Sequence, residues 1–156
     1  MMGEGWSEDL VSVGRLLVAY VLGLPVGWER EQLARTPGLR TFPLVALGSC
    51  AFVLLGATTF DQNADAQARV LQGLLAGIGF IGGGAILKGQ HDVAGVSTAV
   101  GVWITAGIGV ATAYGHYILA VALSLFTLAT LHLLRTPKDA EAWRNAAQDD
   151  EASSDE

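Results

Sequence analysis

The amino-acid sequence predicts an all-α membrane protein. We expect a bundle of about five transmembrane helices, with the N-terminus outside and the C-terminus in the cytoplasm. Three observations favour this fold: an apolar composition, a series of long apolar segments, and a glycine-rich apolar stretch in the middle of the chain. Of the 156 residues, 51% are hydrophobic and only 15% are charged, whereas a globular domain usually carries about 25% charged residues. The charged residues also gather in the tails and connections, which leaves the apolar segments free to meet lipid.

Five segments are long enough to span a bilayer, since a transmembrane helix needs roughly 20 mainly apolar residues to cross about 30 Å of hydrocarbon. Thr41 is expected to cap the second segment, because threonine is a preferred residue before the first turn of a helix. Pro43 follows within that first turn, where proline is tolerated. The link Tyr114–His116 is short, so the last two spans should be antiparallel neighbours. We expect an external N-terminal tail at residues 1–9, a transmembrane domain at 10–136 and an acidic, largely disordered cytoplasmic tail at 137–156. The predicted spans cover approximately residues 10–28, 42–60, 70–87, 93–113 and 117–134.

The orientation follows from the placement of lysine and arginine, which favour the cytoplasmic side of a membrane. Arg69 is the only basic residue outside the spans on the opposite side. This bias requires an odd number of spans and puts the C-terminus inside. The basic residues on the predicted cytoplasmic side are Arg30, Arg35, Arg40, Lys88, Arg135, Lys138 and Arg144.

The segment at residues 73–88 is apolar but rich in glycine, a combination that soluble helices avoid because glycine costs roughly 1 kcal/mol relative to alanine. In a bilayer, small residues let neighbouring helices approach closely. Two alternatives remain: the helix packs closely on several sides, or it breaks near the glycine triplet, which is allowed only where protein or water covers the backbone. The candidate packing glycines are Gly23, Gly27, Gly73, Gly77, Gly79, Gly82, Gly83, Gly84, Gly95 and Gly101.

A few polar residues in or beside the spans are candidates for function. Arg15 lies inside the first span, where it either snorkels to the outer headgroups or faces inward and pairs with the acidic loop bearing Asp61 and Asp65. The charged connection after the first span is either a topology anchor or a docking surface for another protein, with Arg40 as its foremost member. The candidate polar residues are Arg15, Glu29, Arg30, Arg40, Thr41, Asp65, Arg69, Lys88, Ser97 and Thr98.

The composition speaks against several functions. The acidic residues between the tails occur at positions 29, 31, 61, 65 and 92, all in predicted connections, so a magnesium carrier would lack the carboxylates that usually hold this ion. The three histidines are scattered, and the string Gly77-x-Gly79-x-x-Gly82 lies in a membrane span rather than in the βαβ unit that a dinucleotide site needs. We therefore expect no metal, no cofactor, no nucleic-acid partner and no enzymatic activity.

Four motifs in this order resemble the membrane domain of the MgtC/SapB family, from about Arg15 to Arg135. The sequence motifs are Gly23-x-x-x-Gly27-Trp-Glu29-Arg30-Glu31, Gly38-Leu-Arg-Thr-Phe-Pro-Leu-Val-Ala-Leu-Gly48, Gly77-Ile-Gly-Phe-Ile-Gly-Gly-Gly-Ala-Ile-Leu-Lys88 and Gly95-Val-Ser-Thr-Ala-Val-Gly-Val-Trp103.

The resemblance implies a bacterial inner-membrane protein with five spans, connected in some members with growth in low magnesium and survival inside host cells. It implies a regulator that acts through a membrane partner, of which the F-type ATP synthase is the family example. Arg40 and Thr41 match the family's Gly-Leu-Arg-Thr motif, and Asp65 with Arg69 resemble the polar pair before its glycine-rich span. Gly83 stands where alanine is common. The soluble C-terminal domain of MgtC-type members is expected to be missing, so virulence-type regulation is not carried over.

Two hypotheses for function follow. The first is a non-enzymatic membrane regulator that binds membrane proteins through its glycine-rich faces. The second is a small ion channel or transporter, with magnesium as the candidate ion, formed by a homo-oligomer around a broken third span. The lipid bilayer is a partner in either case.

Overall fold

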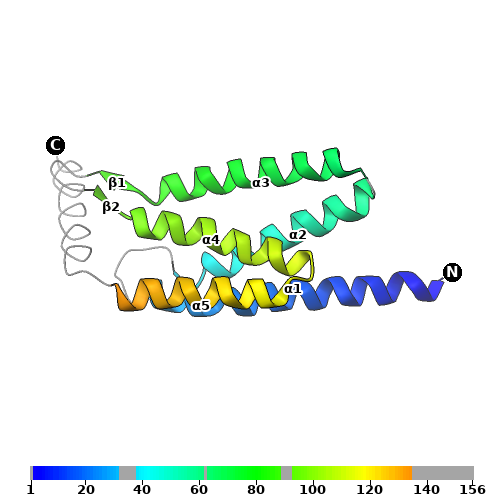
Figure 1. Ribbon diagram of the computed structural model, residues 1–156, viewed down its shortest axis with the longest axis horizontal. Helices are drawn as coiled ribbons and strands as arrows, with labels where there is room; N and C mark the ends of the chain where they lie inside the picture. Colours follow the sequence, from blue (N-terminus) through cyan, green and yellow to red (C-terminus); the bar gives the residue numbers. More distant parts are fainter. Residues whose placement is uncertain (1, 32–37, 62, 89–92, 135–156) are drawn as a thin grey trace.

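Five helices and two short strands form the part of the chain that the computed structural model describes, residues 2–31, 38–61, 63–88 and 93–134. The helices run lengthwise side by side (Figure 1). The predicted class, an all-α membrane bundle, is confirmed, and the predicted tail at 137–156 lies outside the described residues. The helices are α1 (Met2–Glu31), α2 (Phe42–Phe60), α3 (Ala64–Gly84), α4 (Val96–Ala113) and α5 (Tyr117–Leu133).

Helix α4 is the centre of the bundle, because it packs against all four other helices. Helix α3 lies at one edge, where it packs on α2 and α4 (Figure 1). Between α3 and α4, β1 (Leu87–Lys88) and β2 (Val93–Ala94) pair antiparallel. The centre and the edge of the bundle therefore present different amounts of helix surface to the surroundings.

The turn between α4 and α5 explains why these helices are neighbours. Gly115 adopts a φ of +76°, in the left-handed region that glycine enters without strain. Its N–H donates to Thr112 O at 3.0 Å, and the His116 N–H donates to Ala111 O at 2.8 Å. This pair of bonds is the Schellman motif, which satisfies the last carbonyls of a helix. The predicted contact between the last two spans is confirmed.

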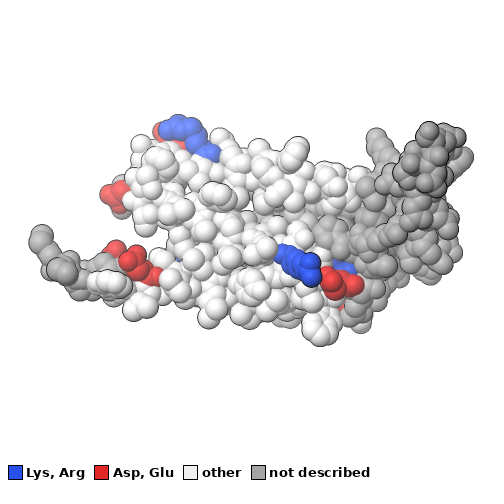
Figure 2. All heavy atoms as spheres, turned by 180° about the vertical axis from the view of Figure 1, so that it is seen from behind, with Lys and Arg blue, Asp and Glu red and all other residues white. Residues whose placement is uncertain are grey.

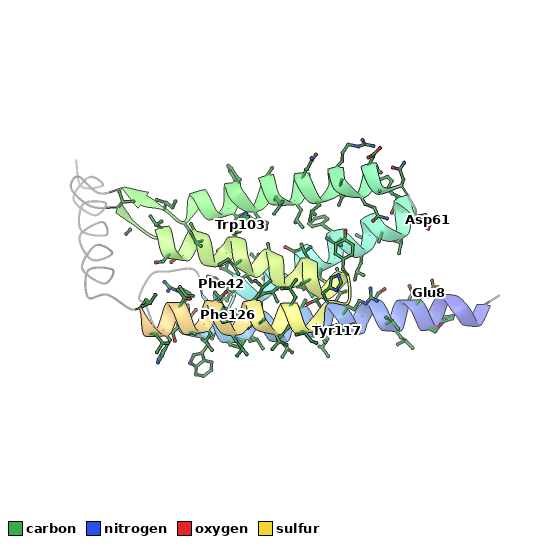
Figure 3. All side chains as sticks on the ribbon, viewed as in Figure 1. Glu8, Phe42, Asp61, Trp103, Tyr117 and Phe126 are labelled. Carbon is green, nitrogen blue, oxygen red and sulfur yellow. The ribbon has the colours of Figure 1, made fainter. Side chains whose placement is uncertain are left out.

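The interior of the bundle holds apolar side chains together with small residues. One cluster joins Val26, Phe42, Val102 and Leu131 from four helices, all at most 7% exposed. Figure 3 shows Phe42 among the helices and Phe126 on the outside of α5. Burial on this scale needs close helix approach, and α2 and α4 meet so closely that a Cβ at Gly109 would overlap Ala46 O.

The outer surface is apolar between two charged ends. Figure 2 shows that, on the face it presents, the described charged side chains lie toward the ends of the bundle. By length and composition, three of the described helices can cross a membrane: α1 from Trp6, α2 and α4. Helix α5 is apolar but shorter, and α3, which covers most of the predicted span at 70–87, is not among the three. Large side chains such as Ile118 (90% exposed) on α5 therefore face the surroundings as lipid-contacting residues would.

The helix bounds correct some predicted ones. α2 has the predicted bounds, but α1 begins at Met2, so residues predicted as a separate tail continue the helix. α3 begins at Ala64 instead of residue 70, because the Asn63 side chain accepts a hydrogen bond from Ala66 N at 3.0 Å and caps the helix. Thr41 is the N-cap residue of α2, yet its side chain makes no capping hydrogen bond.

Candidate functional site

Helix α3 has one side against the bundle and one side open. Ile78 and Gly82 are buried on the bundle side, and Leu74 packs against the core. Ala66, in the first turn of the helix, is also buried, although it lies two turns before Gly73 on the same side of the helix. The other residues on the side opposite Ile78 are all exposed. We call this surface the outward face of α3, and it consists of Asp65, Arg69, Gly73, Ala76, Gly77, Phe80, Gly83 and Gly84.

The glycines of α3 correct the prediction of close packing on several sides. A Cβ at Gly73, Gly77, Gly79, Gly83 or Gly84 would find no neighbouring atom within 4 Å. The physical reason is the position of α3 at the edge of the bundle, where only one side has a neighbour among the described residues. The helix is also unbroken from Ala64 to Gly84 and ends at the glycine triplet instead of breaking inside the span.

Other predicted packing glycines do lie in tight contacts. A Cβ at Gly23 would come within 2.9 Å of Pro43 Cα, and one at Gly27 within 3.1 Å of Leu39 Cα. At the α3–α4 contact, a Cβ at Gly82 would lie 3.2 Å from Ala99 O. In α4, a Cβ at Gly101 would lie 3.2 Å from the Phe42 ring, and Gly95 starts the helix with a φ of +86°.

At the opposite end from Asp61, α1 and α5 meet through a buried carboxylate. Glu29 is 4% exposed and its Oε2 lies 3.3 Å from His132 Nδ1. Arg30 is 5% exposed. Both residues belong to the last turns of α1, so the prediction that they lie in the connection after the first span is wrong for this pair. The cause is that α1 continues to Glu31 and packs there against the bundle.

The remaining predicted polar residues do not gather in one place. Arg40 and Ser97 are exposed, Thr41 is half-buried, and Thr98 is fully buried. The Thr98 hydroxyl has no hydrogen-bond partner among the described residues. Lys88 lies in β1, and its side chain is outside the described set. These residues therefore form no shared site in the described part of the chain.

Arg15 faces inward, as the second predicted alternative has it, but its partner is a different one. Its Nη1 donates to the backbone oxygen of Ala113 at 2.7 Å. Ala113 is the last residue of α4. A cation at this place interacts favourably with the negative end of the helix dipole and satisfies a terminal carbonyl. The side chain is half-buried and faces the bundle, not the headgroups, and its partner is a backbone carbonyl instead of Asp61 or Asp65.

Two residues that matter here were missed by the sequence analysis. Phe80 is 85% exposed on the outward face of α3, and its signal was present, since it is the one aromatic side chain in the glycine-rich stretch. His132 was counted only among the scattered histidines, and its contact with Glu29 joins positions 103 apart in sequence. That contact depends on how α5 packs on α1, which the sequence alone does not specify.

The fold defines the class: a small helical membrane protein whose third helix has one exposed side in the described part of the chain. In the chain as described, no group of three or more His, Cys, Asp or Glu residues is placed to hold a metal ion.

The chain belongs to the MgtC family, whose model matches residues 16–139. It is 38% identical to the protein SrpB of Synechococcus elongatus over 75% of this chain and 71% of that one. It is 39% identical to the protein MgtC of Salmonella typhimurium over 77% of this chain and 51% of that one, so it spans about half the length of that relative. The putative magnesium transporter YhiD of Escherichia coli is 32% identical over 76% of this chain and 58% of its own. No solved structure matches the chain.

Proposed function

We propose that this chain is a multi-pass protein of the bacterial inner membrane that regulates other membrane proteins by direct contact and catalyses no reaction. The contact surface is the outward face of α3. The N-terminus lies outside and the C-terminus in the cytoplasm, as the distribution of basic residues favours. The family resemblance makes the F-type ATP synthase the first partner to test.

One observation carries this proposal: α3 has an open side made of small residues inside an otherwise apolar bundle. Helices associate in lipid mainly through van der Waals contacts between closely packed small-residue surfaces. A lipid chain cannot fit an exposed glycine row as closely as a helix can. The same side carries Arg69 and Gln72, which favour a protein neighbour over hydrocarbon.

The name of one relative supports a link between the proposed activity and magnesium. The name of YhiD describes a putative magnesium transporter, and MgtC is the relative after which the matching family is named. We therefore place the regulation by this chain under magnesium limitation.

A growth experiment tests the proposal. A strain that lacks the gene is complemented with the wild-type chain, with Gly77→Leu on the outward face, or with the matched control Gly14→Leu. Both glycines are exposed helical positions where a Cβ meets nothing within 4 Å, so both variants should fold. We expect Gly77→Leu to lose growth in low magnesium and Gly14→Leu to retain it. Equal growth of both variants at equal protein levels would disprove a regulatory role for this face.

A second candidate, ion transport, is favoured by the name of YhiD and by a row of buried hydroxyls on α4 at Thr98, Thr105 and Thr112. Thr105 donates to Gly101 O and Thr112 to Ile108 O, each at 2.8 Å. The hydroxyls of Thr105 and Thr112 already bond to their own helix, which makes them weaker ion ligands, and only the Thr98 hydroxyl has no partner among the described residues. Flux of magnesium into proteoliposomes that contain only this protein would favour transport, and flux equal to that of empty liposomes would exclude it.

A further inference from the structure

The outward face of α3 has a shape that is complementary to itself. Phe80 is 85% exposed and projects from the middle of this face. Its four nearest neighbours on the helix surface, three and four residues away in each direction, are Ala76, Gly77, Gly83 and Gly84. At the three glycines a Cβ would meet nothing within 4 Å. One large ring is thus surrounded by shallow positions that another ring can occupy.

The spacing of the face is that of a helix pair. Arg69, Gly73, Ala76, Phe80 and Gly83 follow one another at intervals of four, three, four and three residues. Residues at these alternating intervals form a seam along one side of a helix. Two helices can pack along such a seam, with the side chains of one helix between those of the other. The seam lies on the side of α3 opposite Ile78, which packs into the bundle. A neighbour on this seam therefore displaces nothing in the described chain.

The charges on the face are also complementary to themselves. Asp65 and Arg69 lie one helical turn apart and are both exposed. Within the described part of the chain, neither forms an ion pair. All copies of a membrane protein insert in one orientation, so equivalent residues of two copies lie at the same depth. In two parallel α3 helices, Arg69 of each copy then lies within reach of Asp65 of the other.

We propose that a second copy of this chain packs on the outward face of α3, with the two α3 helices parallel and related by a two-fold axis. Such an interface is isologous: each copy contributes the same patch, and each Phe80 ring fills the glycine positions of the other copy. The inference rests on the proposed function, since it names the partner of the same face. A different membrane protein could also pack on the small residues of this face. It would need a basic residue and an acidic residue of its own at the depths of Asp65 and Arg69.

Cysteine crosslinking of the full chain in its native membrane tests this pairing. Cys50 is buried and is the only cysteine, so Cys50→Ala provides a background in which each engineered thiol stands alone. Gly73→Cys and Ala76→Cys probe the face with the Phe80 ring in place, and a Cβ at Gly73 meets no atom within 4 Å. Ile118→Cys on α5, 90% exposed, is the matched control for random collision. After mild oxidation we expect about tenfold more disulfide-linked dimer at positions 73 and 76 than at 118, the ratio that a preference of 1.4 kcal/mol gives. Equal dimer fractions at the three positions, with folded protein, overturn the proposal.

A charge exchange tests the register without altering the glycines. Both residues are exposed, so the variants Asp65→Arg and Arg69→Asp should fold. Each single change should lower the dimer fraction at position 76, because like charges then face each other, and the double exchange should restore it. Failure of the double exchange to restore the dimer contradicts the parallel arrangement.

The crosslinking result and the growth assay separate this inference from the proposed function. If no dimer forms at positions 73 and 76 while Gly77→Leu still loses growth in low magnesium, the second copy is wrong and the face serves a different membrane protein. If no dimer forms and Gly77→Leu grows like the wild type, both proposals are wrong.

Discussion

Helices α3 and α4 are both rich in glycine, but they use it differently. In α4, Gly101 and Gly109 lie against Phe42 and Ala46, and the helix is surrounded by neighbours. In α3, Gly82 alone lies against a neighbour, Ala99, while the other glycines of the helix meet no atom within 4 Å. Glycine content therefore shows that a surface is suited to close packing, but the position of the helix in the bundle decides whether the chain itself supplies the neighbour.

The largest effect that distinguishes these helices is expected at Gly109. A leucine there would overlap Ala46 O and approach Ser49 Cβ, which a Cβ alone already meets at 2.9 Å. We expect a loss of about 3 kcal/mol or failure to fold, as for overpacked cores. Gly77→Leu should leave the stability of the single chain unchanged. Thermal unfolding in mild detergent measures both, and similar losses for the two variants would break the comparison.

A smaller effect is expected where α3 itself touches α4. Gly82→Val places side-chain atoms against Ala99 O, which lies 3.2 Å from a Cβ at this position. The two helices must separate slightly, at a cost of about 2 kcal/mol. Gly84→Val, two residues away on the open side, is the control and should cost nothing, because a Cβ there meets no atom within 4 Å and valine has a higher helix propensity than glycine. Unfolding in detergent compares them, and an equal cost would show that α3 packs differently from this arrangement.

A further change sharpens the contrast at the far end of α4. Arg15→Met keeps most of the side-chain length but removes the hydrogen bond to Ala113 O. We expect the free energy needed to open the end of α4 to fall by about 1.5 kcal/mol, the low end of the range for a hydrogen bond from a charged donor. Hydrogen exchange of the amides at Tyr114 to His116 measures this opening. Arg69→Met on the open face of α3 should leave that exchange unchanged, and an equal increase in both variants would contradict the assignment.

The smallest effect is expected at the contact of α5 with α1. The Ser124 hydroxyl donates to Leu22 O at 2.8 Å, and hydrogen bonds between membrane helices contribute about 0.6 kcal/mol on average. Ser124→Ala should therefore lower stability slightly. Ser97→Ala, at an exposed position of α4, should not. A midpoint shift for Ser124→Ala as large as that of Gly82→Val would show that this bond matters more than the average.

Much of the fold could be predicted because hydropathy and turn residues are local signals. The bounds of α2 and the turn at Gly115 followed from an apolar run and a short polar link. The early start of α3 was missed, although Asn63 is a common cap residue, because polar residues follow it and the prediction followed hydropathy. The extension of α1 to Met2 was missed for the same reason.

The candidate site was less predictable, since it depends on which faces meet in space. The spacing of Gly73, Gly77 and Gly84 placed them on one side of a helix, but no local pattern shows whether that side faces α4 or the membrane. The burial of Glu29 likewise depends on α5, whose His132 is distant in sequence. Local patterns predict helices, and only the packing of the bundle separates a filled glycine surface from an open one.

The central claim is that protein, not lipid, covers the outward face of α3. A photoreactive amino acid placed at position 80, with position 118 as the lipid-facing reference, tests it in native membranes. We predict that position 80 crosslinks to protein and position 118 to lipid. Adducts to lipid alone at both positions would contradict the account.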